Sequence, residues 1–191
     1  MSDLLVLFLY ALAILFFLIG LLWILVPAFY GLPPVPTHLS RIRQALKLAN
    51  LQPDEVLYDL GSGDGRVLVI AAREFGAKAV GIEIGPVQRA FSWVNILWSG
   101  IRDKVRIEAG NFYKVDLGPA DVVFVYATSK EVKKLASHVE KRMKPGSRLV
   151  SISADFPEWE PSAFDERELI FLYEMPPKQG SLMTYLLKKA G

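Results

Sequence analysis

One stretch in the first half of the chain, LYDLGSGDGR at residues 57–66, combines residue types that suit ligand binding. Asp59 ends an apolar run, and Gly61, Gly63 and Gly65 follow at every second position, with Ser62 inside the loop. Glycines permit unusual dihedrals and let a ligand approach the backbone closely. A helix that begins directly after such a turn presents free N–H groups. The pattern predicts a strand, a tight glycine turn and a helix around a bound ligand.

A second acid, Glu83, follows the next apolar run at residues 79–82. A carboxylate at the end of the second strand can accept hydrogen bonds from both hydroxyls of a ribose. The glycine spacing differs from the G-x-G-x-x-G of dinucleotide folds. The pair of Asp59 and Glu83 around this loop resembles the S-adenosyl-L-methionine site of class I methyltransferases. The alternative is a glycine turn in another α/β protein.

Apolar runs and helical patterns alternate along the rest of the chain. This predicts an α/β, Rossmann-like, mostly parallel seven-stranded sheet with helices on both faces. Thr37 is the predicted N-cap of the first helix of the domain. Two strand-like runs, Glu168–Glu174 and Ser181–Lys188, are expected to close the sheet as a C-terminal antiparallel hairpin. We expect strands at 56–60, 78–83, 104–109, 121–126 and 147–154, and helices at about 37–50, 66–75, 86–98 and 129–143.

Ligands of such sheets bind outside the carboxyl ends of the strands, which adds residues from later strands to the candidate site. Asn111 could bond the exocyclic amine of an adenine, and Phe112 could stack on its ring or simply pack in the core. Tyr126, Asp155 and Trp159 are candidates for the acceptor side. Trp159 could shape a channel by cation–π contact, or be a packing residue, and Asp155 could be only a turn acid.

The amino-terminal segment is predicted to be a membrane anchor. No charged residue occurs between Asp3 and Arg41, and residues 4–26 are almost wholly apolar. About 20 such residues span a bilayer, and no basic residue precedes them as in a signal peptide, which is the competing interpretation. We expect an anchor at 1–30, a proline-rich linker at 31–36 and a methyltransferase domain at 37–191. Arg41, Arg43 and Lys47 place that domain on the cytoplasmic side of a single-pass protein.

Composition excludes several other classes. The chain has no cysteine, so it has neither disulfides nor a thiol nucleophile, and its net charge of +2 gives no argument for nucleic acid as a partner. The two histidines, His38 and His138, are scattered. We expect no metal. The basic residues of the helix at 37–50 are expected on a covering helix, with contact to anionic headgroups as the alternative.

Three stretches narrow the resemblance to one branch of the class I methyltransferases. They read PVPTHLSRIRQAL, YDLGSGDGR and SADFPEWEP. They resemble the small lysine methyltransferases of archaea and bacteria. The same branch includes the membrane-anchored mitochondrial enzymes that modify the adenine nucleotide translocase and the ATP synthase c-subunit. The resemblance implies protein N-lysine methylation, with cofactor residues at Asp59, Gly61, Gly63 and Glu83.

The chemistry of the acceptor leaves other functions open. A lysine amine has a pKa of about 10.4 in solution, so it must lose a proton before it attacks the methyl group, and nearby acceptors such as Asp155 could help. We expect a protein substrate near the membrane. One alternative is a methyltransferase for a lipid or small amphiphile, and another is a cofactor-binding membrane scaffold without catalysis.

Overall fold

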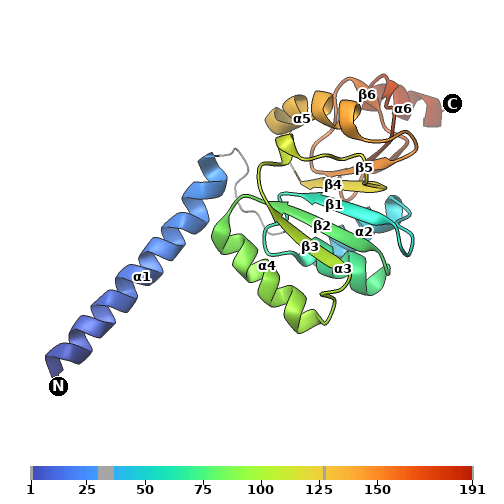
Figure 1. The fold of residues 1–191 in the computed structure, drawn as a ribbon. Coiled ribbons are helices and arrows are strands. Elements are labelled where there is room, and N and C mark those ends of the chain that lie inside the picture. Colours follow the sequence, from blue (N-terminus) through green and yellow to red (C-terminus); the bar gives the residue numbers. More distant parts are fainter. Residues whose placement is uncertain (1, 30–36, 127, 191) are drawn as a thin grey trace.

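A computed structural model describes residues 2–29, 37–126 and 128–190 (Figure 1). The predicted linker at 31–36 lies outside these residues. Helices are α1 (Ser2–Phe29), α2 (Leu39–Leu48), α3 (Arg66–Glu74), α4 (Pro86–Ser99), η1 (Phe112–Lys114), α5 (Ser129–Arg142) and α6 (Leu182–Ala190). Strands are β1 (Val56–Leu60), β2 (Lys78–Glu83), β3 (Val105–Ala109), β4 (Val122–Tyr126), β5 (Arg148–Ile152), β6 (Trp159–Glu160), β7 (Ala163–Asp165), β8 (Ile170–Glu174) and β9 (Lys178–Gln179).

The main sheet has seven strands in the order β3-β2-β1-β4-β5-β8-β7. Strands β1 to β5 are parallel, whereas β8 is antiparallel to β5 and β7 is antiparallel to β8. The strand order reverses between β1 and β4, and ligands of open α/β sheets bind at such a switch point. The predicted Rossmann-like fold with a C-terminal antiparallel hairpin is confirmed.

One of the two expected hairpin strands is confirmed, since β8 lies within the run Glu168–Glu174, but its partner is a different segment. The hairpin strands are β7 and β8, which pair Phe164 with Phe171, and the run at 181–188 is not a strand but most of helix α6. Ser181 caps this helix, because its Oγ accepts a hydrogen bond from the Thr184 N–H at 3.3 Å. Leucine, methionine, lysine and alanine make up most of helix α6, and all are strong helix formers. The N-cap and these propensities outweigh the short alternation of apolar residues that indicates a strand.

Two apolar cores lie on the two faces of the sheet. One lies beneath α2, α3 and α4, with Ile42, Leu68 and Ile96 fully or nearly fully buried. The other lies beneath α5 and holds Leu135 together with Tyr173. Figure 1 shows the corresponding layers, with α3 and α4 on one side of the strands and α5 on the other. Helices therefore cover both faces of the sheet, as in other doubly wound folds.

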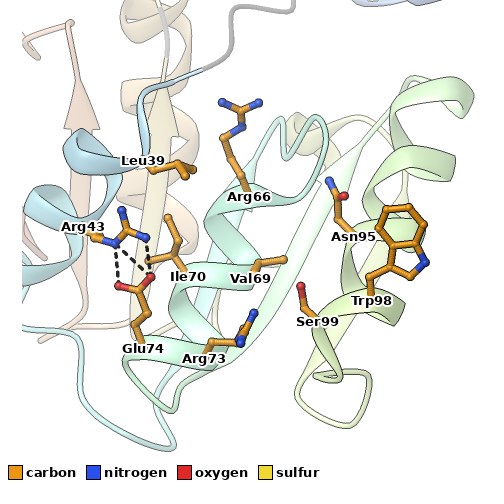
Figure 2. A pocket seen from close by; sticks show the side chains of 10 residues that line it. All are labelled: Leu39, Arg43, Arg66, Val69, Ile70, Arg73, Glu74, Asn95, Trp98 and Ser99. Carbon is orange, nitrogen blue, oxygen red and sulfur yellow. Dashed lines mark hydrogen bonds and ion pairs between the residues drawn. The ribbon is translucent and has the colours of Figure 1, made fainter.

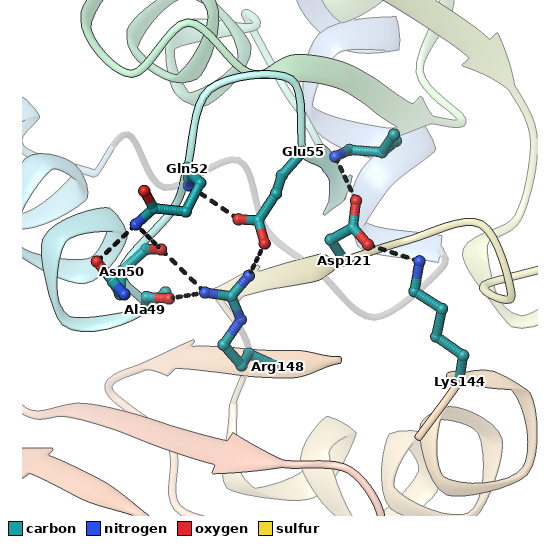
Figure 3. A network of polar contacts seen from close by, with 8 residues as sticks. Ala49, Asn50, Gln52, Glu55, Asp121, Lys144 and Arg148 are labelled. Carbon is teal, nitrogen blue, oxygen red and sulfur yellow. Dashed lines mark hydrogen bonds and ion pairs between the residues drawn. The ribbon is translucent and has the colours of Figure 1, made fainter. Parts of the chain in front are cut away.

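Polar side chains fasten the amino ends of the central strands, at the edge away from the glycine loop (Figure 3). Arg148 donates to the carbonyl oxygens of Ala49 and Asn50 and forms an ion pair with Glu55. Asp121 accepts from the Val56 N–H at 2.8 Å and pairs with Lys144 at 2.5 Å. These contacts join β1, β4 and β5 to the end of α2, so they fix the scaffold rather than a site.

Helix α2 begins later than expected. His38, not Thr37, occupies the N-cap, and its side chain makes no capping hydrogen bond. The Thr37 carbonyl oxygen instead accepts from Arg66 at 2.9 Å. Arg41 pairs with Glu168 and Arg43 pairs with Glu74, so both arginines are bound within the domain. These contacts favour the interpretation of α2 as a covering helix.

Helix α1 stands apart from the sheet along most of its length (Figure 1). Residues Asp3–Leu25 form a 23-residue apolar span with a mean hydropathy of 3.0. None of its most apolar stretch is buried inside the protein. Near its carboxyl end, Trp23 meets α4: its ring lies edge-on to Phe91 at 5.1 Å. The Trp23 carbonyl oxygen also accepts from Gln88 Nε2 at 2.8 Å. Helix α1 therefore reaches the domain through α4.

Candidate active site

The glycine loop connects β1 to α3 at the switch point of the sheet. Gly61, Gly63 and Gly65 all have positive φ, at 92°, 54° and 79°. A Cβ added at Gly65 would lie 2.1 Å from Ser92 Oγ. Glycine is therefore required at position 65 both for its dihedral angle and for the close approach of α4.

Ser62 helps to shape the loop from inside. Its backbone N–H donates to the Ile82 carbonyl oxygen at 3.1 Å, beside the bond from the Gly61 N–H at 2.9 Å. Its hydroxyl is buried and would lie 2.6 Å from a Cβ at Gly81, so it faces β2. Its carbonyl oxygen accepts from the Gly65 N–H at 2.8 Å, so both backbone polar groups of Ser62 hold the loop in shape.

Glu83 joins the end of β2 to the glycine loop. Its Oε2 accepts from the Gly63 N–H at 2.8 Å, and its Oε1 accepts from the Gly85 N–H at 2.7 Å. Burial raises the pKa of this carboxyl, and the N–H groups of Gly85 and Gly63 partly offset that effect. A carboxylate has about four acceptor positions, so Glu83 keeps acceptor capacity for donors such as ribose hydroxyls. The sequence-based placement of Glu83 beside the loop agrees with this geometry.

Asp59 lies at the carboxyl end of β1, where only 3% of its surface is exposed. Burial raises the pKa of its carboxyl well above the usual value, and the charges of Glu83 and Asp64 raise it further. A cluster of acids in a buried position favours a ligand that carries hydrogen-bond donors or positive charge. Among the residues that the structure describes, no group of three or more histidine, cysteine, aspartate or glutamate side chains is placed to hold a metal ion.

Asn111 and Phe112 follow β3, at the same edge of the sheet as Glu83. Asn111 Oδ1 caps η1 by accepting from the Tyr113 N–H at 2.9 Å. This leaves the amide N–H₂ of Asn111 and a second lone pair of its oxygen for a base. Phe112 is 9% exposed and packs against Tyr113, with the ring centroids 4.5 Å apart. The ring thus belongs to the core on the α5 side of the sheet.

Two linked hydrogen bonds lie directly after β5, at the residue that the sequence suggested for contact with a methyl acceptor. The Tyr173 hydroxyl donates to Asp155 Oδ1 at 3.0 Å and accepts from the Phe156 N–H at 3.0 Å. Tyr173 is fully buried, while Asp155 is partly exposed. Burial raises the pKa of the Asp155 carboxyl, and the bond from Tyr173 partly lowers it. Asp155 is therefore a fixed carboxylate rather than a free turn acid.

The other two candidates are Trp159, which begins β6, and Tyr126, which ends β4. Trp159 is 3% exposed and stacks on Phe156, with ring centroids 4.5 Å apart and planes 6° from parallel. Because Phe156 covers one of its faces, Trp159 supports the loop that holds Asp155. Tyr126 ends β4 and pairs in register with Ile152 of β5, which places it partly buried at the same edge.

Sequence reasoning missed Tyr173. It stands in an apolar run, and its importance depends on β8 lying beside β5, where Tyr173 pairs with Leu149. A single polar hydroxyl in a strand that is otherwise apolar was the available signal, because a buried hydroxyl needs a partner.

Comparison with known proteins identifies the family. Residues 59–163, more than half of the chain, match the ANTKMT methyltransferase domain. The chain belongs to this methyltransferase family. A protein-lysine N-methyltransferase of Saccharolobus islandicus is 37% identical over 130 residues, which cover 68% of this chain and 81% of that protein. The lysine N-methyltransferase for the ATP synthase c-subunit from Xenopus laevis is 26% identical over 130 residues, which cover 68% of this chain and 57% of that protein.

A solved structure shows the same fold with a ligand. The RNA methyltransferase from Salinibacter ruber, in complex with S-adenosyl-L-homocysteine, has a TM-score of 0.72 and 34% sequence identity, and the match covers 74% of this chain and 94% of that one. The protein is thus a class I methyltransferase whose cofactor is S-adenosyl-L-methionine. The glycine cradle and the free acceptor positions of Glu83 fit that group.

Proposed function

We propose that this methyltransferase N-methylates lysine side chains of proteins. The observation that carries the proposal is the Asp155 carboxylate, which Tyr173 fixes at the sheet edge where the cofactor loop also lies. A carboxylate suits an ammonium group, which it can orient and from which it can accept a proton. The names of the Saccharolobus and Xenopus relatives agree with this acceptor.

S-adenosyl-L-methionine, when bound, supplies the electrophilic methyl group. We propose that Glu83 holds the ribose hydroxyls and that Asp59 and the backbone of Gly61, Ser62, Gly63 and Gly65 line the remainder of the cofactor site. Asn111 and Phe112 border the adenine. The residues of the chain thereby align donor and acceptor, which is the main requirement of an in-line displacement.

On the acceptor side, the incoming lysine must lose a proton before its nitrogen forms the new N–C bond. Asp155 accepts that proton or passes it to water, and burial assists because it raises the pKa of this carboxyl. Tyr126 borders the amine, and Trp159 shapes the channel through its packing on Phe156. The sulfur keeps the electron pair of the S–C bond that breaks, so charge and atoms balance.

We also propose that residues 1–30 anchor the enzyme in a membrane, that 31–36 form a linker and that 37–191 form the methyltransferase domain. The length of the apolar span supports this, since 23 residues at 1.5 Å each exceed the hydrocarbon thickness of about 30 Å. The basic residues after the span favour a domain on the cytoplasmic side. An anchor raises the effective concentration of the enzyme near membrane proteins.

The acceptor class is tested by incubating the full-length protein with membranes of its source cell and radiolabelled cofactor. Label should appear in a discrete protein band, and Glu83→Ala should abolish it. Label in the lipid extract would point to a lipid acceptor, and label in RNA would point to the activity named for the Salinibacter protein. Alkaline extraction of the membranes tests the anchor separately, because an anchored protein stays in the pellet.

A further inference from the structure

Helix α4 buries two polar residues and exposes most of its large apolar residues. Gln88, Ser92 and Ile96 are its buried positions, spaced four residues apart. The Ser92 hydroxyl and Gln88 Oε1 are buried without a hydrogen-bond partner among the described residues. The opposite face is exposed and consists of large apolar side chains: Phe91 (52% exposed), Trp93 (39%), Val94 (42%), Leu97 (55%) and Trp98 (86%). We call these five residues the outer face of α4.

Helix α5 offers a comparison, because its exposed face is one that is suited to water. It has the same length of 14 residues. Its exposed positions are polar or charged throughout: Ser129, Lys130, Lys133, Lys134, Ser137, Glu140, Lys141 and Arg142. An exposed apolar patch of this kind marks a site of contact with a partner or a membrane. Exposure of the outer face of α4 to water is therefore unfavourable, whereas exposure of α5 is not, so another surface is expected to cover α4.

The position of α1 indicates which surface covers the outer face of α4. Trp23 lies within the last turn of the apolar span and contacts Phe91 of the outer face at 5.1 Å. Gln88, in the first turn of α4, bonds the carbonyl oxygen of Trp23. In Figure 1, α4 runs crosswise to α1 and forms the side of the domain that faces it. A helix that crosses a bilayer and a helix that lies along its surface would meet in this way.

Composition agrees with a lipid surface. Helix α4 has one basic residue, Arg89, and no acidic residue. Its Trp98 also borders a groove of about 670 Å³ between α2, α3 and α4, and Figure 2 shows Arg43 on the opposite side of this groove, beside Glu74. Tryptophan is enriched at the level of the lipid headgroups. Arg43 pairs with Glu74 and Arg66 pairs with Asp64, so the apolar outer face and Trp98, rather than these arginines, would contact the lipid.

We propose that the outer face of α4 lies in the headgroup region of the bilayer that α1 enters. The inference rests on the proposed anchor and adds an orientation to it. Gly85, whose N–H binds Glu83, directly precedes α4. Docking of α4 therefore holds the cofactor site next to the lipid surface, and lysines close to the bilayer are the acceptors that the site can reach.

Single cysteines test this in the full-length protein, because the chain has none of its own. Nitroxide labels are placed by Leu97→Cys in α4, by Leu15→Cys in α1 and by Leu187→Cys in α6. Leu187 is the matched control, since it is a leucine of similar exposure (67%) on a helix far from α1 in Figure 1. The protein is reconstituted in vesicles of phosphatidylcholine and phosphatidylglycerol. Collision rates of each label with oxygen and with a water-soluble nickel chelate are then measured.

The proposal predicts that the ratio of oxygen to nickel collisions is several-fold higher at position 97 than at position 187. A label at 97 that collides freely with nickel, while the label at 15 is lipid-embedded, would overturn α4 docking and leave the anchor intact. A label at 97 that is hidden from both reagents would overturn it too, because protein, such as a second copy of the chain, would then cover the face. Nickel access at 15 would instead overturn the anchor on which the inference rests.

Discussion

Replacing Tyr173 by phenylalanine removes one hydroxyl and two hydrogen bonds. The hydroxyl donates to Asp155 Oδ1 and accepts from the Phe156 N–H, each at 3.0 Å. Because Tyr173 is fully buried, the Phe156 N–H loses its partner in a place that water does not reach. A buried polar group without a partner costs about 1–3 kcal/mol. We expect the free energy of unfolding to fall by about that amount, measured by urea denaturation.

The same substitution should change the pH dependence of catalysis. The bond from Tyr173 lowers the pKa of Asp155 against the larger effect of burial, so its removal raises that pKa further. If the ionised carboxylate accepts the proton of the substrate ammonium, the acid limb of kcat/KM moves to higher pH. The rate of Tyr173→Phe should therefore fall most at the acid end of the profile.

Tyr113→Phe is the matched control for this experiment. The Tyr113 hydroxyl also binds a carboxylate, that of Glu131 at 2.8 Å, and neither residue bonds Asp155. It should lower stability without moving the acid limb. An unchanged acid limb in Tyr173→Phe, together with the expected loss of stability, would refute a catalytic role of the Asp155 carboxylate and reduce Tyr173 to a packing residue.

Three further predictions concern the cofactor site and the scaffold. Glu83→Gln should weaken binding of S-adenosyl-L-homocysteine by about 10- to 100-fold in calorimetry, because bonds to a charged group contribute about 1.5–3 kcal/mol; unchanged affinity would argue against ribose binding. Gly65→Ala should lower stability by about 1–3 kcal/mol, since its Cβ meets Ser92 Oγ, and Ser92→Gly should restore part of the loss. Burial opposes ionisation of Asp121, yet Lys144 holds the pKa of that carboxyl below 3.8. The ion pair of Asp121 with Lys144 therefore stabilises the fold above pH 3.8, and this stabilisation is lost as the pH falls through the lowered pKa. Lys144→Met should make this loss of stability at acid pH smaller, as measured in thermal unfolding curves.

The central strands were predictable because each is a short apolar run with a clear end. The bounds of β1 and β2 agree with those expected from sequence, since Asp54 and Gly76 supply turns with positive φ just before or between them. The proximity of Glu83 to the glycine loop followed from the rule that parallel strands end at one edge. These features depend on local sequence and on the topology of neighbouring strands.

The tail was harder because its structure depends on distant partners. The run from Ser181 alternates enough to indicate a strand, yet Ser181 caps a helix, and Lys188 of that helix pairs with Glu160. The role of Tyr173 likewise arises from the pairing of β8 with β5, strands that are not consecutive in the chain, because β6 and β7 come between them. The aromatic residues of α4 could be read as packing residues from sequence, but only the fold shows that they face outward.

The central claim is that the acceptor is a lysine amine, and the most direct test is the chemical identity of the methylated product. Membranes are incubated with the full-length protein and isotopically labelled S-adenosyl-L-methionine, and the modified protein is hydrolysed for mass spectrometry. The account predicts labelled N-methyllysine, strongly reduced with Asp155→Asn and absent with Glu83→Ala. Label on another side chain, on lipid or on RNA, with N-methyllysine absent, would contradict it.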